Sequence, residues 1–148
     1  MTISELKLEL DKLNRSIKVL TKNPAIWDLG EFSPEIRQSV KSADDCFLSD
    51  ELYGVMYRLE NTSSMLDYLS RPIVGEYILS KNSRGRYECS QHEYTSGDRI
   101  EYYSYDEYDE KYKWVRSRVE YNSDIGDYYI VGAPNLISLE GLKVRIRE

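Results

Sequence analysis

Hydrophobic residues at the start of the chain recur at alternating steps of three and four positions. The repeat comprises Ile3, Leu6, Leu10, Leu13, Ile17 and Leu20. Such steps place the side chains on one face of a helix and are typical of a coiled-coil seam. Thr2 or Ser4 can cap the first turn, because both side chains accept hydrogen bonds from backbone N–H groups. The pattern therefore predicts an amphipathic helix over about residues 3–20.

A break after this helix leads to a second hydrophobic seam. The Asn-Pro pair at 23–24 ends the helix, Gly30 permits a turn, and the Ser-Pro-Glu run at 33–35 is typical of a helix start. Helical spacing then resumes at Ile36, Val40, Ala43 and Phe47. The second seam follows and comprises Leu48, Leu52, Val55, Leu59, Leu66 and Leu69. The Ser-Asp-Glu run at 49–51 can restart a helix, so this region is one long helix or two. We expect an antiparallel hairpin of two or three helices, with the first packed against the last.

The spacing of hydrophobic residues falls to two after Pro72, which is typical of strands. Residues 76–79 (EYIL) and 86–89 (RYEC) flank a polar turn and predict a hairpin. Residues 98–105 (DRIEYYSY) and 111–121 (KYKWVRSRVEY) predict a second, longer hairpin around an acidic tip.

The last predicted strand has the clearest alternation. In residues 142–147 every second position is hydrophobic and the others are Lys or Arg. Residues 127–131 (DYYIV) predict another strand, and residues 136–141 (LISLEG) a short helical turn. Five or six short strands with one such turn favour a small SH3-like antiparallel β-barrel. The predicted fold class is α+β, with a helical hairpin over residues 1–71 followed by a barrel over residues 72–148.

Net charge limits the kinds of partner. The chain of 148 residues has 20 Lys and Arg against 26 Asp and Glu, a formal net charge of −6, and a pI of about 5.0. A protein that binds the phosphate backbone of nucleic acid broadly needs a basic surface. The acidic balance disfavours direct nucleic-acid binding and favours a basic protein partner. The 14 tyrosines suit half-buried sheets and binding surfaces, because each ring has a polar tip.

Cysteine usage and the N-terminal sequence bear on location. Cys46 and Cys89 fall in different halves without a CxxC pair, and a small secreted domain is usually denser in cysteine. The first ten residues are amphipathic rather than an apolar signal core, and no window reaches the length of a transmembrane helix. We expect a soluble cytoplasmic protein with reduced thiols and no membrane contact.

The sequence contains no catalytic or cofactor-binding motif of a known pattern. It has no GxGxxG, P-loop or HExxH, and its one histidine, His92, is too few to build a zinc site with two cysteines. Cys89 lies three residues before His92, and in a continuous strand that odd spacing puts the two on opposite faces. The expectation is a protein that is not an enzyme, uses no cofactor and holds no metal.

The densest cluster of acids lies at the tip of the second hairpin. The candidate partner-binding residues are Tyr102, Tyr105, Asp106, Glu107, Tyr108, Asp109 and Glu110. Closely spaced carboxylates steer the encounter with a basic surface, and tyrosine rings bury much area at a small entropy cost. The alternative is an ordinary solvated hairpin that protects an edge strand from aggregation.

A second candidate surface lies on one face of the strand at 111–121. It comprises Tyr112, Trp114, Arg116 and Arg118. Rings and guanidinium groups both stack on bases, so this face could bind a nucleic-acid strand or a peptide. The alternative is that Trp114 packs under the helices while the arginines pair with neighbouring acids. The turn at 83–86 (SRGR) is likewise either a phosphate-binding turn or a solvated hairpin tip.

The C-terminal half resembles a small bacterial domain of uncharacterised function. The segments that carry the resemblance are residues 85–89 (GRYEC), 96–103 (SGDRIEYY), 113–121 (KWVRSRVEY), 127–132 (DYYIVG) and 139–147 (LEGLKVRIR). The resemblance begins at about residue 72, rests on scattered Gly, Trp and strand residues, and includes no catalytic motif. It implies a genomic neighbourhood of plasmids, conjugative elements and phages, mainly in Gram-positive bacteria, where many small proteins act on host defence. It assigns no role to any residue.

These observations lead to two main hypotheses. The first is a non-catalytic acidic protein that occupies the basic groove of a nucleic-acid-handling enzyme as a DNA mimic, for example an anti-defence factor such as an anti-CRISPR inhibitor. The second is a nucleic-acid-binding module that uses the Trp114 face and the basic final strand, with the helices serving as a dimer interface. A structural adaptor that joins partners through its seam is a third. The sequence leaves open whether the leucine seams close within one chain or in a homodimer.

Overall fold

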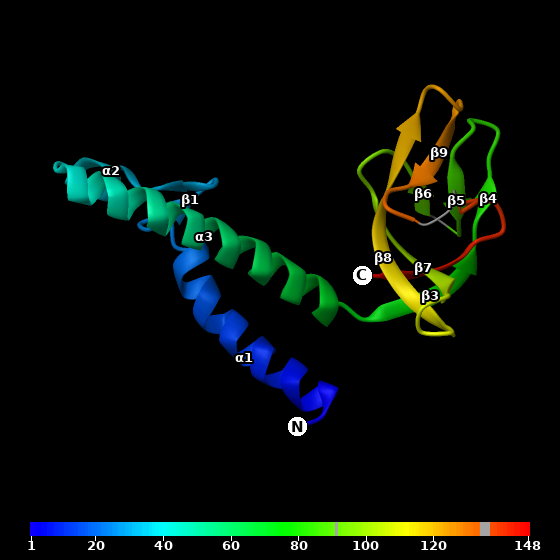
Figure 1. The fold of residues 1–148 in the computed structure, drawn as a ribbon, viewed down its shortest axis with the longest axis horizontal. Coiled ribbons are helices and arrows are strands. Elements are labelled where there is room, and N and C mark those ends of the chain that lie inside the picture. Colours follow the sequence, from blue (N-terminus) through cyan, green and yellow to red (C-terminus); the bar gives the residue numbers. More distant parts are fainter. Residues whose placement is uncertain (91, 134–136) are drawn as a thin grey trace. The chain divides into compact units, whose positions relative to one another are not determined.

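The computed structural model of the protein describes residues 1–90, 92–133 and 137–148. It consists of two compact units, Met1–Arg71 and Pro72–Glu148, and the boundary falls where hydrophobic spacing changes (Figure 1). The first unit is mainly helical and the second contains antiparallel sheets, so the protein mixes helix and sheet.

The first helix forms as its sequence predicts. Helix α1 (Ile3–Thr21) begins at the cap Thr2, whose hydroxyl accepts a hydrogen bond from the Glu5 backbone N–H. The Glu5 carboxylate accepts the Thr2 backbone N–H in return, which completes a capping box. Ser33 caps the short helix α2 (Pro34–Ser39).

The second seam lies on one long helix. Helix α3 (Ala43–Ser70) has 28 residues, starts at the cap Ser42 and continues through the Ser-Asp-Glu run at 49–51 without a break. The interruption lies earlier, between Ser39 and Ser42, because the Ser42 hydroxyl accepts the Asp45 N–H and fixes a new helix start there.

A small hairpin connects α1 to α2. Strands β1 (Trp27–Asp28) and β2 (Glu31–Phe32) pair across a two-residue turn, in which Leu29 and Gly30 have φ values of 50° and 84°. Positive φ at both positions is the geometry of a tight hairpin turn, which explains the glycine. The buried Trp27 ring meets Phe32 edge-on at 5.4 Å and its Nε1 donates to Glu60 of α3 at 3.1 Å.

Helices α1 and α3 run in opposite directions, as predicted for a helical hairpin (Figure 1). Polar contacts tie them together: the Asn14 amide and the Lys18 ammonium both bind Asp67, and the Ser70 hydroxyl donates to Asp11. The hydrophobic seam of α1 is only partly covered, because Leu6, Leu13 and Leu20 remain exposed. No helix among the described residues is both long and apolar enough to cross a membrane.

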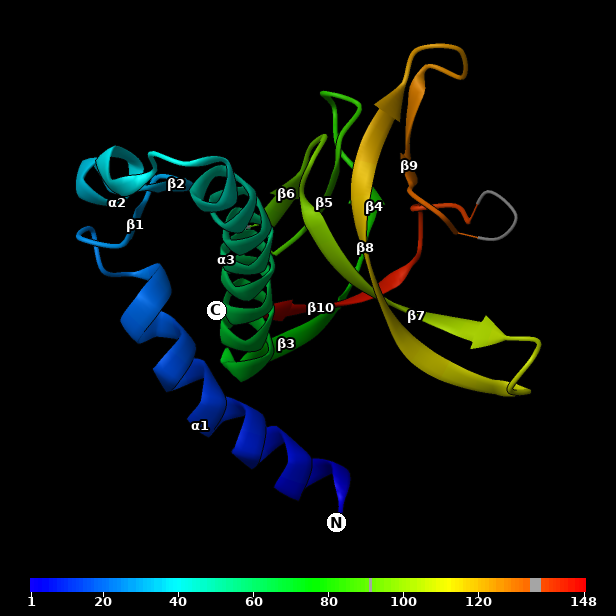
Figure 2. The same cartoon turned by 60° about the vertical axis from the view of Figure 1, so that its left-hand side comes forward.

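The described residues of the second unit form two antiparallel sheets (Figure 2). The larger has the strand order β3 (Ile73–Ile78), β10 (Lys143–Arg147), β7 (Arg99–Asp106), β8 (Lys111–Asn122) and β9 (Asp127–Ile130). The smaller has the order β4 (Ser80–Lys81), β5 (Tyr87–Cys89) and β6 (His92–Tyr94). Figure 2 shows β8 as a long curved strand between the turns to β7 and β9.

The predicted SH3-like barrel is not confirmed. Among the described strands, the ladders form two separate sheets with no closed barrel, and β3 and β9 are the edges of the larger one. The hairpin predicted around the polar turn forms with a shifted first strand. Strand β4 pairs with β5 across this turn, whereas residues 76–78 belong to β3 and pair with the C-terminal strand β10. Of the helical turn predicted at 136–141, residue 136 lies outside the described residues, and residues 139–141 form a bend and a turn.

The core of the second unit follows the alternation of its strands. It comprises Leu79, Tyr87, Cys89, Tyr94, Ile100, Tyr102, Val119, Ile130, Leu139 and Val144. The inward position of Val144 confirms the alternation predicted for the last strand. The other face of β10, β7 and β8 carries the basic and aromatic side chains.

Candidate functional site

The β7–β8 hairpin carries all the candidate binding residues. Its strands pair in continuous antiparallel register up to the turn. The Asp106 carboxylate closes that turn by accepting the backbone N–H groups of Tyr108 at 2.9 Å and Asp109 at 3.1 Å. Glu110 has a φ of 49°, a left-handed conformation at the point where the chain enters β8. The acidic tip is therefore a hydrogen-bonded turn.

Strand alternation separates the predicted partner-binding residues. The Tyr102 side chain points into the core and is only 3% exposed, because it follows Ile100 by two positions and shares its inward face. Tyr102 therefore does not belong to the exposed surface on which the sequence analysis placed it. Tyr108, at the turn, is 95% exposed. Tyr105 is exposed as well.

The carboxylates of the turn differ in whether a nearby ammonium group neutralises their negative charge. Asp106 forms an ion pair with Lys113, and Asp109 lies 3.6 Å from the same ammonium group. Among the described residues, Glu107 and Glu110 have no ion-pair partner, and both are exposed. The turn therefore neutralises part of its own charge and presents the remainder to solvent.

The Asp106–Lys113 pair predicts a specific pH dependence. The hydrogen bond from Lys113, assisted by the Asp109 backbone N–H, holds the pKa of Asp106 below its usual value of 3.8. A depressed folded-state pKa stabilises the turn above the unfolded value, and this contribution is lost as the pH falls through the folded value. We expect the Asp106 carboxyl ¹³C signal to titrate below 3.8 in the native chain, and its midpoint to rise in Lys113→Met. A midpoint that is the same in both proteins would argue against the ion pair.

A cavity of about 510 Å³ lies beside the turn. Five of the seven predicted partner-binding residues line it: Tyr102, Tyr105, Asp106, Glu107 and Tyr108. Its wall also includes Lys113 and Val115 from β8 and Ile137 from the segment after β9. Ligand pockets typically have volumes of about 300–1,000 Å³. The structure therefore brings most of the predicted residues together around one concave site, which a flat solvated tip would not provide.

The second predicted surface lies on the opposite face of the hairpin and is an aromatic cluster. Tyr103 stacks on Tyr112 with ring centroids 5.3 Å apart and meets Trp114 at 5.1 Å. From β10, the Arg145 guanidinium lies 4.7 Å from the Trp114 ring centroid and the Lys143 ammonium 5.7 Å. Trp114 is therefore half-buried under groups of its own sheet, while Tyr112 is 61% exposed.

The two predicted arginines of β8 are exposed and have acidic neighbours. Arg118 Nε lies 3.1 Å from Glu120, and Arg116 stands opposite Glu101 in the β7–β8 ladder. Tyr103 is not among the residues predicted for this face, whereas the basic side chains of the final strand, which is β10, were predicted to join it. Their alternation was visible in the sequence, but the pairing of β10 with β7 was not, because these strands lie about forty residues apart along the chain.

A buried carboxylate joins β7 to the arginines of β10. Glu101 is 4% exposed and pairs with Arg145 and, at 2.7 Å, with Arg147. Glu76, Arg145, Glu101 and Arg116 lie opposite one another on four adjacent strands, so charge alternates across the sheet. The basic residues of β10 are thus engaged in holding this face together.

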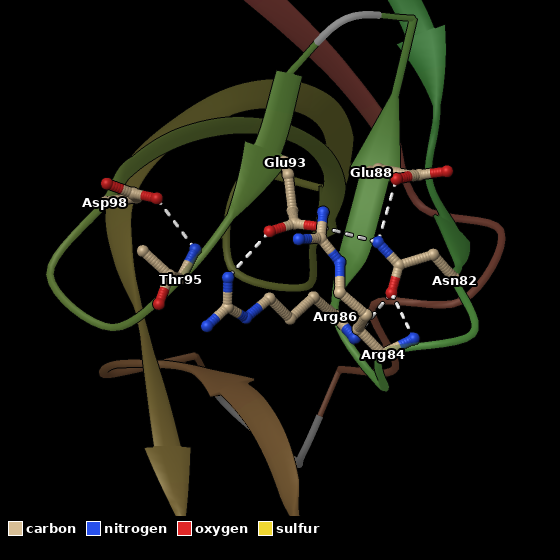
Figure 3. Close-up of polar contacts among 7 residues, drawn as sticks. All are labelled: Asn82, Arg84, Arg86, Glu88, Glu93, Thr95 and Asp98. Atoms are coloured by element: carbon tan, nitrogen blue, oxygen red, sulfur yellow. Dashed lines mark hydrogen bonds and ion pairs between the residues drawn. The ribbon is translucent and has the colours of Figure 1, made fainter.

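The SRGR turn is organised by an acid of the neighbouring strand (Figure 3). The Glu93 carboxylate accepts hydrogen bonds from Arg86 at 2.8 Å, from Asn82 at 2.7 Å and from Arg84. The Arg86 hydrogen bond lowers the pKa of Glu93, so the acid stays ionised at neutral pH. Because both guanidinium groups bind Glu93, the structure favours a structural turn over a phosphate site.

Cys89 and His92 lie directly opposite each other on β5 and β6. The two residues belong to neighbouring strands rather than to one continuous strand, so the alternation expected within a continuous strand does not apply to them. Cys89 is buried, and burial raises the pKa of its thiol. The thiolate is the nucleophilic form, so this environment disfavours catalysis. Among the described residues, no group of three His, Cys, Asp or Glu is placed to hold a metal ion.

Comparison with known proteins places the hairpin inside a recognised domain. A family model described as a domain of unknown function (DUF5348) matches residues 76–146. The match lies in the C-terminal half and contains both candidate surfaces of the β7–β8 hairpin, and it leaves out the three helices. No curated protein and no solved structure matches the chain.

Proposed function

We propose that this protein is a non-catalytic interaction protein whose β7–β8 turn binds a basic surface of a partner protein. The observation that carries the proposal is the convergence of five predicted contact residues on one cavity of about 510 Å³. The exposed Tyr108 and Glu107 lie on its wall, and Glu110 follows in the same turn. Aromatic anchors beside a charged rim are the usual composition of a protein contact.

The partner class that fits this site is a nucleic-acid-handling enzyme. Such enzymes line their grooves with Lys and Arg to hold phosphate groups, and an acidic turn on a protein of net charge −6 is complementary to them. By occupying the groove as a DNA mimic, the protein would inhibit or modulate the enzyme. The mobile-element setting implied by the sequence resemblance is consistent with an anti-defence role, of which an anti-CRISPR factor is one form.

The cysteines are consistent with a cytoplasmic location for this activity. Both are free thiols, Cys46 exposed on α3 and Cys89 buried in the sheet unit. An exposed thiol persists in a reducing compartment, whereas a small secreted protein would usually pair it.

Reversing the two uncompensated charges of the turn tests the proposal. Glu107→Lys combined with Glu110→Lys breaks no ion pair among the described residues, so the fold should tolerate the change. With the partner enzyme purified from the host, we expect association to slow by about tenfold at low salt and its salt dependence to flatten, because steering is lost. Stopped-flow association kinetics at several salt concentrations measure both effects.

A matched control distinguishes the effect of the charges in the turn on association from the effect of net charge. Asp124→Lys combined with Glu148→Lys changes the net charge by the same amount at exposed positions outside the turn. This control should retain most of the native association rate. Equal slowing by the two double variants, or none by the first, would reject the turn as the contact.

A second candidate function is the binding of single-stranded nucleic acid on the aromatic face of the hairpin. The observation that favours it is the exposed Tyr112 ring stacked on Tyr103, with Arg116 and Arg118 on the same face. A stacked base contributes about 1–3 kcal/mol. If this face binds, a labelled oligonucleotide at low salt should give saturable anisotropy that Tyr112→Ala weakens about tenfold and Tyr121→Ala leaves unchanged. Absence of saturable binding would remove this candidate.

We also propose that the helical unit forms a homodimer through its exposed seam. The seam comprises Leu6, Leu13, Leu20, Leu52, Val55 and Leu69. The α1 leucines recur every seven residues, which is the spacing that packs against another helix with the same repeat. A second copy offers that repeat on both of its helices, so two hairpins would complete a four-helix arrangement.

A further inference from the structure

The cavity beside the β7–β8 turn is lined by a tyrosine whose residue as a whole is nearly buried. Tyr102 is 3% exposed and lines the cavity, and its hydroxyl has no hydrogen-bond partner among the described residues. Burial raises the pKa of this phenol, which therefore stays protonated and can both donate and accept. The buried side-chain atoms without a hydrogen-bond partner among the described residues are Asn14 Oδ1 and Ser63 Oγ, so solvent reaches the Tyr102 hydroxyl. A ligand that enters the cavity can replace that solvent and form the hydrogen bond instead.

The wall around this hydroxyl combines negative charge with apolar surface. Asp106 and Glu107 contribute two carboxylates and Lys113 one ammonium group, so the lining has one excess negative charge. Val115 and Ile137 supply aliphatic surface to the same wall. A ligand with a cationic head on an aliphatic stem matches both features.

The tyrosines of the wall favour a planar cation. Tyr108 lines the cavity together with Tyr102, and tyrosine faces attract cations, most often guanidinium groups. The Tyr105 ring instead packs against Tyr112 in the aromatic cluster. Guanidinium also has five donors in a fixed plane, whereas an ammonium group is a compact point charge. Two acceptors, a hydroxyl and a carboxylate, suit the planar group better.

We propose that the cavity is an anchor site for an arginine side chain, with the stem against Val115 and Ile137 and the guanidinium between the Tyr102 hydroxyl and Asp106. This inference rests on the proposed function in that the arginine would belong to the basic partner surface. The volume of about 510 Å³ exceeds that of one side chain, which leaves room for the adjoining backbone of the partner. In the free protein, Lys113 takes the place of the ligand on Asp106.

An NMR titration of the full-length protein with Nα-acetyl-arginine amide tests the site directly. The methyl signals of Val115 and Ile137 should shift and saturate with a dissociation constant of about 1 mM, as expected for a small ligand with few contacts. Nα-acetyl-citrulline amide, which has nearly the same shape without the charge, should bind at least about tenfold more weakly.

Two variants test the assigned groups against one control. Tyr102→Phe removes only the hydroxyl and should weaken arginine amide binding about tenfold, whereas Tyr121→Phe, outside the cavity lining, should not. Lys113→Met removes the internal competitor for Asp106 and should strengthen binding severalfold. This gain cannot result from unfolding, and the loss in Tyr102→Phe distinguishes the site from a general acidic patch.

The outcomes separate this site from the proposed function. Equal binding of arginine and citrulline amides, or no loss in a folded Tyr102→Phe, overturns the anchor site even if charge reversal at Glu107 and Glu110 still slows the partner. If the arginine amide binds as described but those reversals leave partner association unchanged, the anchor site stands and the proposed partner contact is rejected.

Discussion

Replacing Glu101 by glutamine is expected to lower the free energy of unfolding of the sheet unit by about 3 kcal/mol. Glu101 is 4% exposed and holds both Arg145 and Arg147, whose side chains are 20% and 12% exposed. Glutamine keeps the shape but removes the charge, so two partly buried guanidinium groups lose their counter-ion. Because these arginines retain some solvent, the loss belongs at the low end of the range for a broken buried pair.

This effect is measured by unfolding the full chain in urea. The NMR signals of Val119 and Val144 are monitored during the titration, because they report on the sheet unit. Glu76→Gln is the matched control, since Glu76 pairs with Lys143 at 2.6 Å in a largely exposed setting and should change stability by less than about 1 kcal/mol. Replacing Glu101, Arg145 and Arg147 together by methionine should recover most of the loss, because the buried carboxylate and both of its guanidinium partners are then removed together. Similar effects of Glu101→Gln and Glu76→Gln would contradict the structural role of the buried acid.

A single charge in the α1 seam is expected to convert a homodimer to a monomer. Light scattering after size exclusion should give a native mass of about twice the chain mass of 17.4 kDa. Leu13→Glu places a carboxylate in the middle of the proposed helical interface, where desolvation without a partner costs several kcal/mol, and the mass should fall to that of one chain.

Leu8→Glu is a closely matched control for this result. Leu8 and Leu13 lie on the same helix and are 56% and 52% exposed, but Leu8 is off the heptad seam. The same substitution there should leave the mass unchanged. A native protein that runs as a monomer, or a dimer that survives Leu13→Glu, would reject the seam as an interface.

Local signals in the sequence predicted the elements well. The cap at Thr2, the helix start at Ser33 and the β7–β8 hairpin all form as predicted, because each depends on a short stretch of chain. Pairings between distant segments were not predictable in the same way. Strand β3 pairs with β10 across most of the sheet unit, and no residue of β3 specifies that partner.

In the candidate site, too, the residue types could be identified from the sequence, whereas the contacts between strands could not. The residue type of Tyr102 and its position near the acidic tip predicted that it belongs to the same surface. Strand alternation from Ile100 already implied that the Tyr102 side chain faces inward. The sequence was therefore sufficient to exclude Tyr102 from the exposed surface and to place it on the inner face of the strand. The ion pair between Asp106 and Lys113 depends on how the two strands align at the turn, which the sequence alone did not specify.

The contrast between the two cysteines makes the protein convenient to label. Cys46 is exposed on α3, whereas Cys89 is buried and its raised pKa keeps it in the unreactive thiol form. A maleimide dye or spin label should therefore attach at Cys46 alone, without any engineered mutation. That position lies outside the β7–β8 hairpin, so one reporter per chain could follow both subunit exchange and partner capture without touching either candidate surface.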